Sequence, residues 1–120
     1  MSDDEPSGPS RPLSEVKAEL FKALAHPARV RVLEVLATGE HSVGEMQPLV
    51  GIESSHLSQQ LGVLRRAGVV AHRKEGSSVV YSLIDPIVAD LLSVAKRLLH
   101  TRLQGTRDLL DDLSAEVGPR

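Results

Sequence analysis

Hydrophobic positions in the first third of the chain recur at helical spacing. Val16, Leu20 and Leu24 stand four residues apart, which predicts a first helix with Ser14 as its N-cap. His26-Pro27 interrupts this pattern, and Pro27 suits the first position of a second helix over the run ARVRVLEVLA. We expect this second helix to end near Thr38-Gly39.

A third, short helix is marked at both ends. Ser42 followed by Glu45 has the spacing of a capping box, in which each side chain satisfies a free backbone N–H group of the first turn. The pattern continues through Val50, and Gly51 is placed to stop it.

The next helix begins around Ser54 and ends before Gly68. Its leucines Leu57, Leu61 and Leu64 stand at i, i+4 and i+7, which predicts one buried stripe. Only Gly51-Ile52-Glu53 separates it from the preceding helix, which is the short turn expected in a helix-turn-helix unit.

Two β-rich runs and a long helical run complete the pattern. The segment VVAHRKEGSSVVYSL predicts a hairpin that turns at Glu75-Gly76-Ser77-Ser78, with Val79, Tyr81 and Leu83 on one face. Asp85-Pro86 predicts the start of a long helix, which we expect Gly105 to kink or end. The order of elements predicts a mainly α fold with a small β-hairpin (α-α-α-α-β-β-α), a winged helix-turn-helix.

Composition restricts the other possibilities. The chain has 120 residues, 41% of them hydrophobic, which suits one small domain with an aliphatic core. There is no cysteine, which excludes disulfides and thiolate metal sites. No apolar run reaches the length of a membrane span and the acidic start does not resemble a signal peptide, so we expect a cytoplasmic protein.

The chain divides into three parts by composition. Residues 1–12 are rich in Pro, Ser, Gly and Asp and are expected to be a disordered acidic tail. Residues 13–103 are expected to form the folded DNA-binding and dimerisation domain. Residues 104–120 are expected to form an acidic, partly helical extension.

Positive charge is concentrated between these acidic ends, at Arg65, Arg66, Arg73 and Lys74. This concentration is compatible with binding nucleic acid despite the net charge of −2.

The outward side of the fourth helix carries the candidate DNA-reading groups. With the leucines turned inward, Ser55, Gln59 and Arg66 fall on the opposite side, flanked by His56, Ser58 and Gly62. Glutamine can bond to adenine through two hydrogen bonds, and serine or histidine can reach a base edge or a phosphate. A solvated polar face, as on any surface helix, is the alternative interpretation.

The hairpin tip adds a second indication. Arg73 and Lys74 precede a Gly-Ser turn that allows close approach to a DNA backbone, which predicts a wing. The alternative is a charged tip that only keeps the hairpin soluble.

Three segments resemble the ArsR/SmtB family of bacterial metal-responsive repressors: ALAHPARVRVLEVL, LSQQLGVLRRAGVV and EGSSVVYSL. The resemblance covers about residues 15–100 in register. It implies a homodimer, one recognition helix for each half of an inverted-repeat operator, and release of the operator when an inducer binds.

The resemblance also assigns residues to these roles. The expected DNA contacts, combined with those from helical spacing, are Ser54, Ser55, His56, Ser58, Gln59, Arg66, Arg73, Lys74 and Gly76. The first and last helices are expected to form the dimer interface. Within them, the apolar positions predicted to contribute are Val16, Leu20, Val88, Leu91, Leu92, Ala95, Leu98 and Leu99.

The sensor sites of the family are where this chain departs from the pattern. The third-helix run is VGEMQPLV, without the family's cysteines, so Met46 is expected in the core. In the last helix Asp85 matches the first ligand position, but Ile87, Leu98 and Thr101 occupy the others, and Asp85 is better explained as a cap. A divalent metal such as nickel or zinc could still bind imidazole and carboxylate groups gathered by dimerisation, with His41 and His100 as candidates.

Three functions therefore stay open at this point. The first is a DNA-binding repressor released by a metal at a non-standard site. The second is a regulator of the same kind that responds to a small molecule or a partner protein. The third is a winged-helix module that binds proteins. We do not expect an enzyme, because the sequence contains no recognisable nucleophile motif, phosphate loop or zinc-protease motif.

Overall fold

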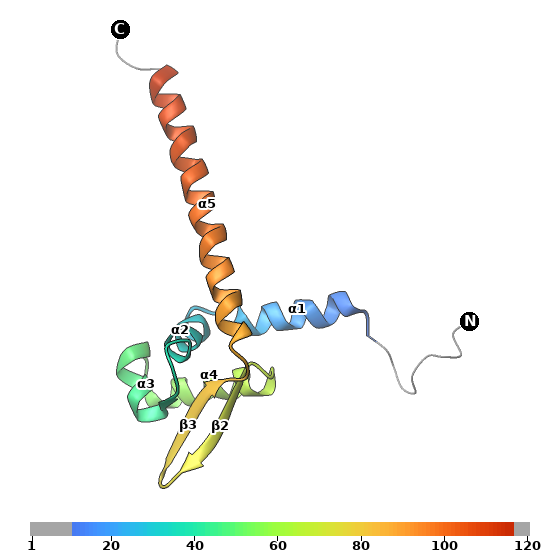
Figure 1. Ribbon diagram of the computed structural model, residues 1–120, viewed down its shortest axis with the longest axis vertical. Helices are drawn as coiled ribbons and strands as arrows, with labels where there is room; N and C mark the ends of the chain where they lie inside the picture. Colours follow the sequence, from blue (N-terminus) through green and yellow to red (C-terminus); the bar gives the residue numbers. More distant parts are fainter. Residues whose placement is uncertain (1–10, 117–120) are drawn as a thin grey trace, which may run out of the picture.

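The computed structural model describes residues 11–116, so the expectation of a disordered tail falls mostly outside the described residues. The chain folds as four helices, a small sheet and one long helix (Figure 1). In chain order the elements are α1 (Leu13–Leu24), α2 (Pro27–Leu36), β1 (His41–Ser42), α3 (Val43–Val50), α4 (Ser54–Arg66), β2 (Val70–Glu75), β3 (Ser78–Leu83) and α5 (Ile87–Glu116).

Several predicted helix ends are confirmed. Ser42 and Glu45 form both hydrogen bonds of a capping box at the start of α3, and Gly51 ends that helix in the left-handed conformation at φ 80°. Pro27 occupies the first turn of α2, and the Nδ1 atom of His26 accepts a hydrogen bond from the Ala28 N–H at 3.1 Å. Asp85 caps α5 by accepting from the Ile87 N–H at 2.8 Å.

Two predicted ends are wrong. Ser14 is not the cap of α1, because the helix already begins at Leu13 and its N-cap position is Pro12. Gly105 does not end α5, which continues through it as one helix to Glu116 (Figure 1). No neighbouring group lies within 4 Å of where a Gly105 side chain would begin, so nothing packs there to bend the helix.

The hairpin belongs to a three-stranded sheet. The order is β1-β3-β2, with both pairings antiparallel, and β1 adds only His41 and Ser42 opposite Tyr81 and Val80. β1 was not predicted from the sequence, because two residues are too few to show alternation. This strand joins the sheet directly to the capped start of α3.

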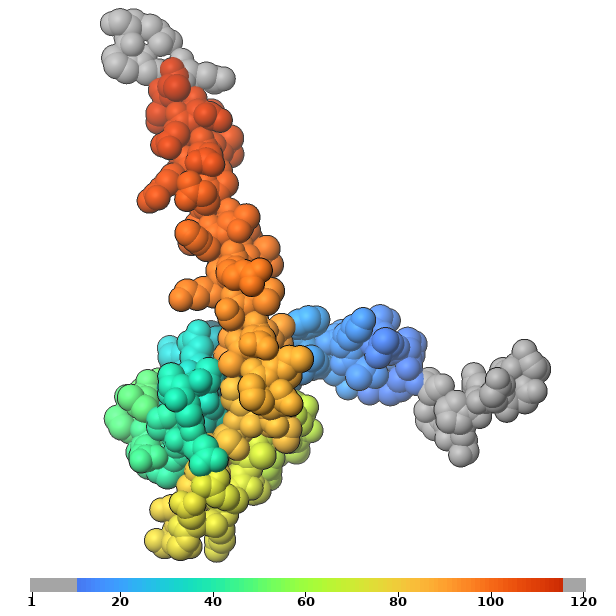
Figure 2. All heavy atoms as spheres, viewed as in Figure 1, coloured from blue at the N-terminus to red at the C-terminus, as the bar shows by residue number. Residues whose placement is uncertain are grey.

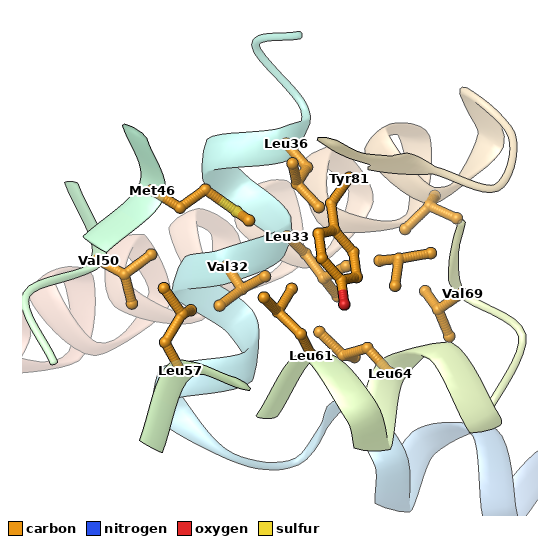
Figure 3. Packing of buried hydrophobic residues seen from close by; sticks show 12 residues of the cluster. Val32, Leu33, Leu36, Met46, Val50, Leu57, Leu61, Leu64, Val69 and Tyr81 are labelled. Carbon is orange, nitrogen blue, oxygen red and sulfur yellow. The ribbon is translucent and has the colours of Figure 1, made fainter. Parts of the chain in front are cut away.

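The core lies where α2, α3, α4 and the sheet meet (Figure 3). Leu57, Leu61 and Leu64 are fully buried, as the i, i+4, i+7 spacing predicts. Met46 is also fully buried among these side chains, which confirms its predicted place in the core. Tyr81 closes the core from the sheet, with Val79 and Leu83 packed beside it.

Two helices extend away from this core. Only the first turns of α5 lie against the body of the molecule, and the rest stands free (Figure 2). α1 projects from the core in a different direction (Figure 1) and has no buried residue. No helix within residues 11–116 is long and apolar enough to cross a membrane.

Candidate nucleic-acid interface

The outer side of α4 is polar and accessible. Ser54, Ser55, Ser58, Gln59 and Arg66 are all exposed. Of these, Ser55, Gln59 and Arg66 lie on the side of the helix opposite the buried leucines. No acidic residue lies within α4, whose last turn carries Arg65 and Arg66. This surface can therefore approach phosphate without repulsion from its own side chains.

His56 is the exception among the predicted contacts of α4. It is half-buried, and its ring meets the edge or face of His26 with the centroids 6.2 Å apart and the planes at 85°. His56 therefore contacts the junction between α1 and α2, while the neighbouring serines are exposed.

Gln60 has a structural role that was not predicted from the sequence. It is 6% exposed, the only polar or charged side chain in the described part of the chain that is buried. Its Oε1 atom accepts a hydrogen bond from the Arg29 guanidinium at 2.9 Å, and Arg29 also donates to the Ala23 carbonyl at 2.6 Å. Arg29 thus joins the end of α1 to the inner side of α4. Helical spacing could have revealed this, since Gln60 lies three residues from Leu57 on the same stripe.

The hairpin presents its predicted residues at the surface. Arg73, Lys74 and Gly76 are all exposed, and Gly76 turns the chain at φ 63°, a conformation that glycine adopts without strain. A basic strand end followed by a tight turn is thus present, as predicted.

Arg73 is not a free cation, however. Its guanidinium forms a pair of hydrogen bonds with the Glu40 carboxylate at 2.9 and 3.0 Å, and a third with Glu75 at 2.7 Å. The hydrogen bonds and charge of Arg73 lower the pKa of Glu40, and those of the two carboxylates raise the pKa of Arg73. The contact with Glu40 was not predicted from the sequence, because no local pattern connects residues 33 positions apart.

The opposite face of the hairpin holds a second basic group. The Arg65 guanidinium lies 3.1 Å from Nε2 of His72, and His72 stacks on Tyr81 with the ring centroids 5.4 Å apart. Lys74 follows His72 by two residues and so points to the same face. The contact between Arg65 and His72 holds the end of α4 against the wing.

The predicted dimer residues fall into two groups. Val16, Leu20, Leu98 and Leu99 are exposed, the last two by 61% and 52%, and Ala95 is exposed as well. Val88 is only 8% exposed and belongs to the chain's own core, while Leu91 and Leu92 are half-buried. Val88 is therefore removed from the expected interface, because packing inside one chain already accounts for it.

The candidate metal ligands lie on different elements. His41 belongs to β1, where its Nδ1 atom lies 2.8 Å from the Gly39 carbonyl oxygen. His100 lies on α5 and lines a groove between α2 and α5 together with Glu34 and Arg107. Within residues 11–116 no three histidine or acidic side chains come close enough together to hold a metal ion.

Comparisons with known proteins agree with this geometry. A helix-turn-helix domain family matches residues 24–73. The uncharacterized HTH-type transcriptional regulator Rv0081 of Mycobacterium tuberculosis is 54% identical over 107 residues, which cover 88% of this chain and 94% of that protein. A biofilm growth-associated repressor of Agrobacterium fabrum is 48% identical and covers 62% of this chain and 64% of its own. A probable mercury resistance operon repressor of Streptomyces lividans is 36% identical, with 70% and 67% covered.

Solved structures show the same fold. The crystal structure of Rv0081 superposes with a TM-score of 0.75 at 55% identity, covering 81% of this chain and 98% of that chain. The solution structure of Mb0332 from Mycobacterium bovis, described as a homodimeric winged helix-turn-helix DNA-binding domain and a possible ArsR-family regulator, gives a TM-score of 0.72 at 28% identity. It covers 83% of this chain and 95% of that one. The chain belongs to the ArsR/SmtB family of winged helix-turn-helix transcriptional regulators.

Proposed function

We propose that this regulator reads DNA by placing the outer side of α4 in the major groove. The observation that carries the proposal is the asymmetry of α4, whose leucines are fully buried while the opposite side is polar, exposed and free of acidic groups. Such a helix can present donors and acceptors to base edges while the core holds its orientation. The proposed base-reading and nearby positions are Ser54, Ser55, His56, Ser58, Gln59 and Arg66.

The wing supplies contacts to the sugar-phosphate backbone in this proposal. Lys74 and the Gly76 turn approach the phosphates, and Arg73 joins them when it leaves its carboxylate partners. Backbone contacts of this kind position the protein without reading sequence. In this proposal the residues of α4 set the sequence specificity, and those of the wing set the overall affinity.

We further propose that the protein binds as a homodimer through the exposed apolar positions of α1 and α5. Val16 and Leu20 of α1 are exposed in one chain, as are Leu98 and Leu99 of α5. A two-fold interface is the commonest way to cover two such faces, and it places two copies of α4 on one side.

Selection of binding sites from a random duplex pool tests the DNA-reading proposal. The expected product is an inverted repeat whose half-sites are about one helical turn apart, because a two-fold dimer presents its two recognition helices at that spacing. A pool without enrichment would instead favour a winged-helix module that binds proteins.

Sedimentation tests the dimer. Leu98→Asp should give monomers, since it places a charge at an exposed position of the proposed interface. Leu49→Asp is the matched control, because Leu49 is similarly exposed at 58% but lies on α3. Equal sedimentation of the two variants would contradict the proposed interface.

For the inducer we propose a divalent metal such as nickel or zinc, held by ligands from both chains and including His100, so that the protein acts as a metal-released repressor. The support is that His100 faces a groove with Glu34, while a second chain is needed to complete a set of ligands.

The alternative is an apolar small molecule in the same groove of about 1060 Å³, whose walls include Val30, Leu92 and Leu99. Operator binding titrated with a panel of metals distinguishes them, since release by no metal would favour the small molecule or a partner protein.

A further inference from the structure

The positive charge of Arg73 on the wing is neutralised by carboxylates of the same chain. Arg73 is paired with both Glu40 and Glu75, so this cluster of three side chains has two negative charges for one positive charge. All three side chains are about half exposed, so solvent and a DNA phosphate can reach them. A phosphate arriving here meets a guanidinium that already donates three hydrogen bonds to carboxylates.

The pair with Glu40 crosses the whole width of the sheet. Arg73 on β2 and Ser42 on β1 both lie opposite Val80 of the central strand β3. Glu40 precedes Ser42 by two residues, so it lies on the same face of the sheet as Arg73. The bridge therefore ties the outer strand of the wing to the segment that leads into α3.

Phosphate and carboxylate compete for the same part of Arg73. A guanidinium offers its paired N–H groups to carboxylates and to phosphates in the same geometry. An exposed pair of this kind is worth little in free energy, so a DNA backbone can displace it, but the displacement still reduces the net gain from binding.

We propose that Glu40, with Glu75, holds Arg73 in an autoinhibited state and thereby sets the affinity of the wing for DNA backbone phosphates. This inference rests on the proposed DNA-binding face and concerns how strongly one of its contacts is used. Glu40 acts through Arg73 and touches no DNA itself. The consequence is weaker binding to random duplex DNA, which raises the relative weight of the base contacts made by α4.

A double-mutant cycle tests the proposal, with the full chain and a random-sequence duplex as the probe. Glu40→Gln keeps the shape of the side chain and removes its charge. It should tighten binding about two- to fivefold at low salt, as expected for release of an exposed pair. It should also steepen the dependence of log affinity on log salt by just under one, for one more phosphate contact.

The second arm of the cycle removes the cation. In an Arg73→Gln background, Glu40→Gln should change neither the affinity nor the salt slope. Asp90→Asn is the matched control for charge alone, because Asp90 is exposed on α5 and lies outside the cluster. It should leave the salt slope unchanged in either background.

Two results would overturn the inference. One is a Glu40→Gln variant that binds duplex DNA equally or more weakly, which would make the bridge a structural brace. The other is a gain in DNA affinity from Glu40→Gln that persists in the Arg73→Gln background. Such a gain would show that removing a negative charge, and not releasing Arg73, strengthens binding. Failure of the wild-type protein to bind any duplex DNA would instead defeat the proposed function, so the two failures can be told apart.

Discussion

Neighbouring glutamines on α4 differ in their surroundings by a single helical step. Gln59 is exposed toward the proposed groove, whereas Gln60 is buried and accepts a hydrogen bond from Arg29. The two side chains have the same chemistry, so their surroundings alone decide their roles. They also provide a matched pair for mutation.

Gln59→Ala should relax the sequence preference at one base pair and cost about 1–3 kcal/mol on the selected site. Its unfolding free energy should stay near wild type, because the side chain packs against nothing in the core. Gln60→Ala should lower the stability instead, since it leaves the half-buried Arg29 donor without its partner. Anisotropy with matched and mismatched duplexes, together with urea unfolding, measures both effects. Equal loss of discrimination in the two variants would contradict this assignment.

The pairing of Glu40 makes a prediction about pH. Arg73 lowers the pKa of Glu40 from 4.5, so ionised Glu40 stabilises the folded state at pH above that value. This contribution should be lost as the pH falls through the lowered pKa. The difference in unfolding free energy between wild type and Glu40→Gln should therefore be present near neutral pH and vanish in acid. A difference that is unchanged in acid would show that the ion pair does not stabilise the fold.

At the scale of elements, local signals in the sequence were sufficient for most helix ends. The capping box of α3, the proline of α2 and the glycine after α3 each act within a few residues, and each is confirmed. The expectation for Gly105 was wrong because a lone glycine weakens a helix without forcing it to end, and α5 meets no opposing contact there. The short strand β1 could not be predicted, since only its pairing with β3 defines it.

Gly105→Ala follows from the uninterrupted course of α5. Alanine is the better helix former by ~1 kcal/mol, and the added methyl group meets no atom of the same chain. The variant should show increased helical circular dichroism and a higher melting temperature. A lower melting temperature would mean that a second chain approaches α5 closely at this glycine.

At the scale of the whole molecule, the sequence predicts the two sides of α4 better than it predicts contacts between residues that are distant along the chain. The leucine stripe and the polar side of α4 are visible as spacing, so the buried and exposed sides of this helix could be predicted. The pair of Arg73 with Glu40 joins residues 33 positions apart, and the link from Arg29 to Gln60 joins residues 31 positions apart. Only the folded chain brings them together. The exposed apolar residues of α1 and α5 are likewise recognised only in the structure, where both helices project from the core (Figure 1).

The central claim is that the exposed side of α4 enters a DNA groove, and placing one negative charge there tests it most directly. Gln59→Glu should fold normally, because the position is exposed, and should lose most of its affinity for duplex DNA through repulsion from the phosphates and base acceptors. Ser114→Glu is the control, since it adds the same charge at an exposed position near the far end of α5. The account predicts that anisotropy titrations detect loss of binding in the first variant and near wild-type binding in the second. Unchanged affinity of a folded Gln59→Glu protein would contradict it.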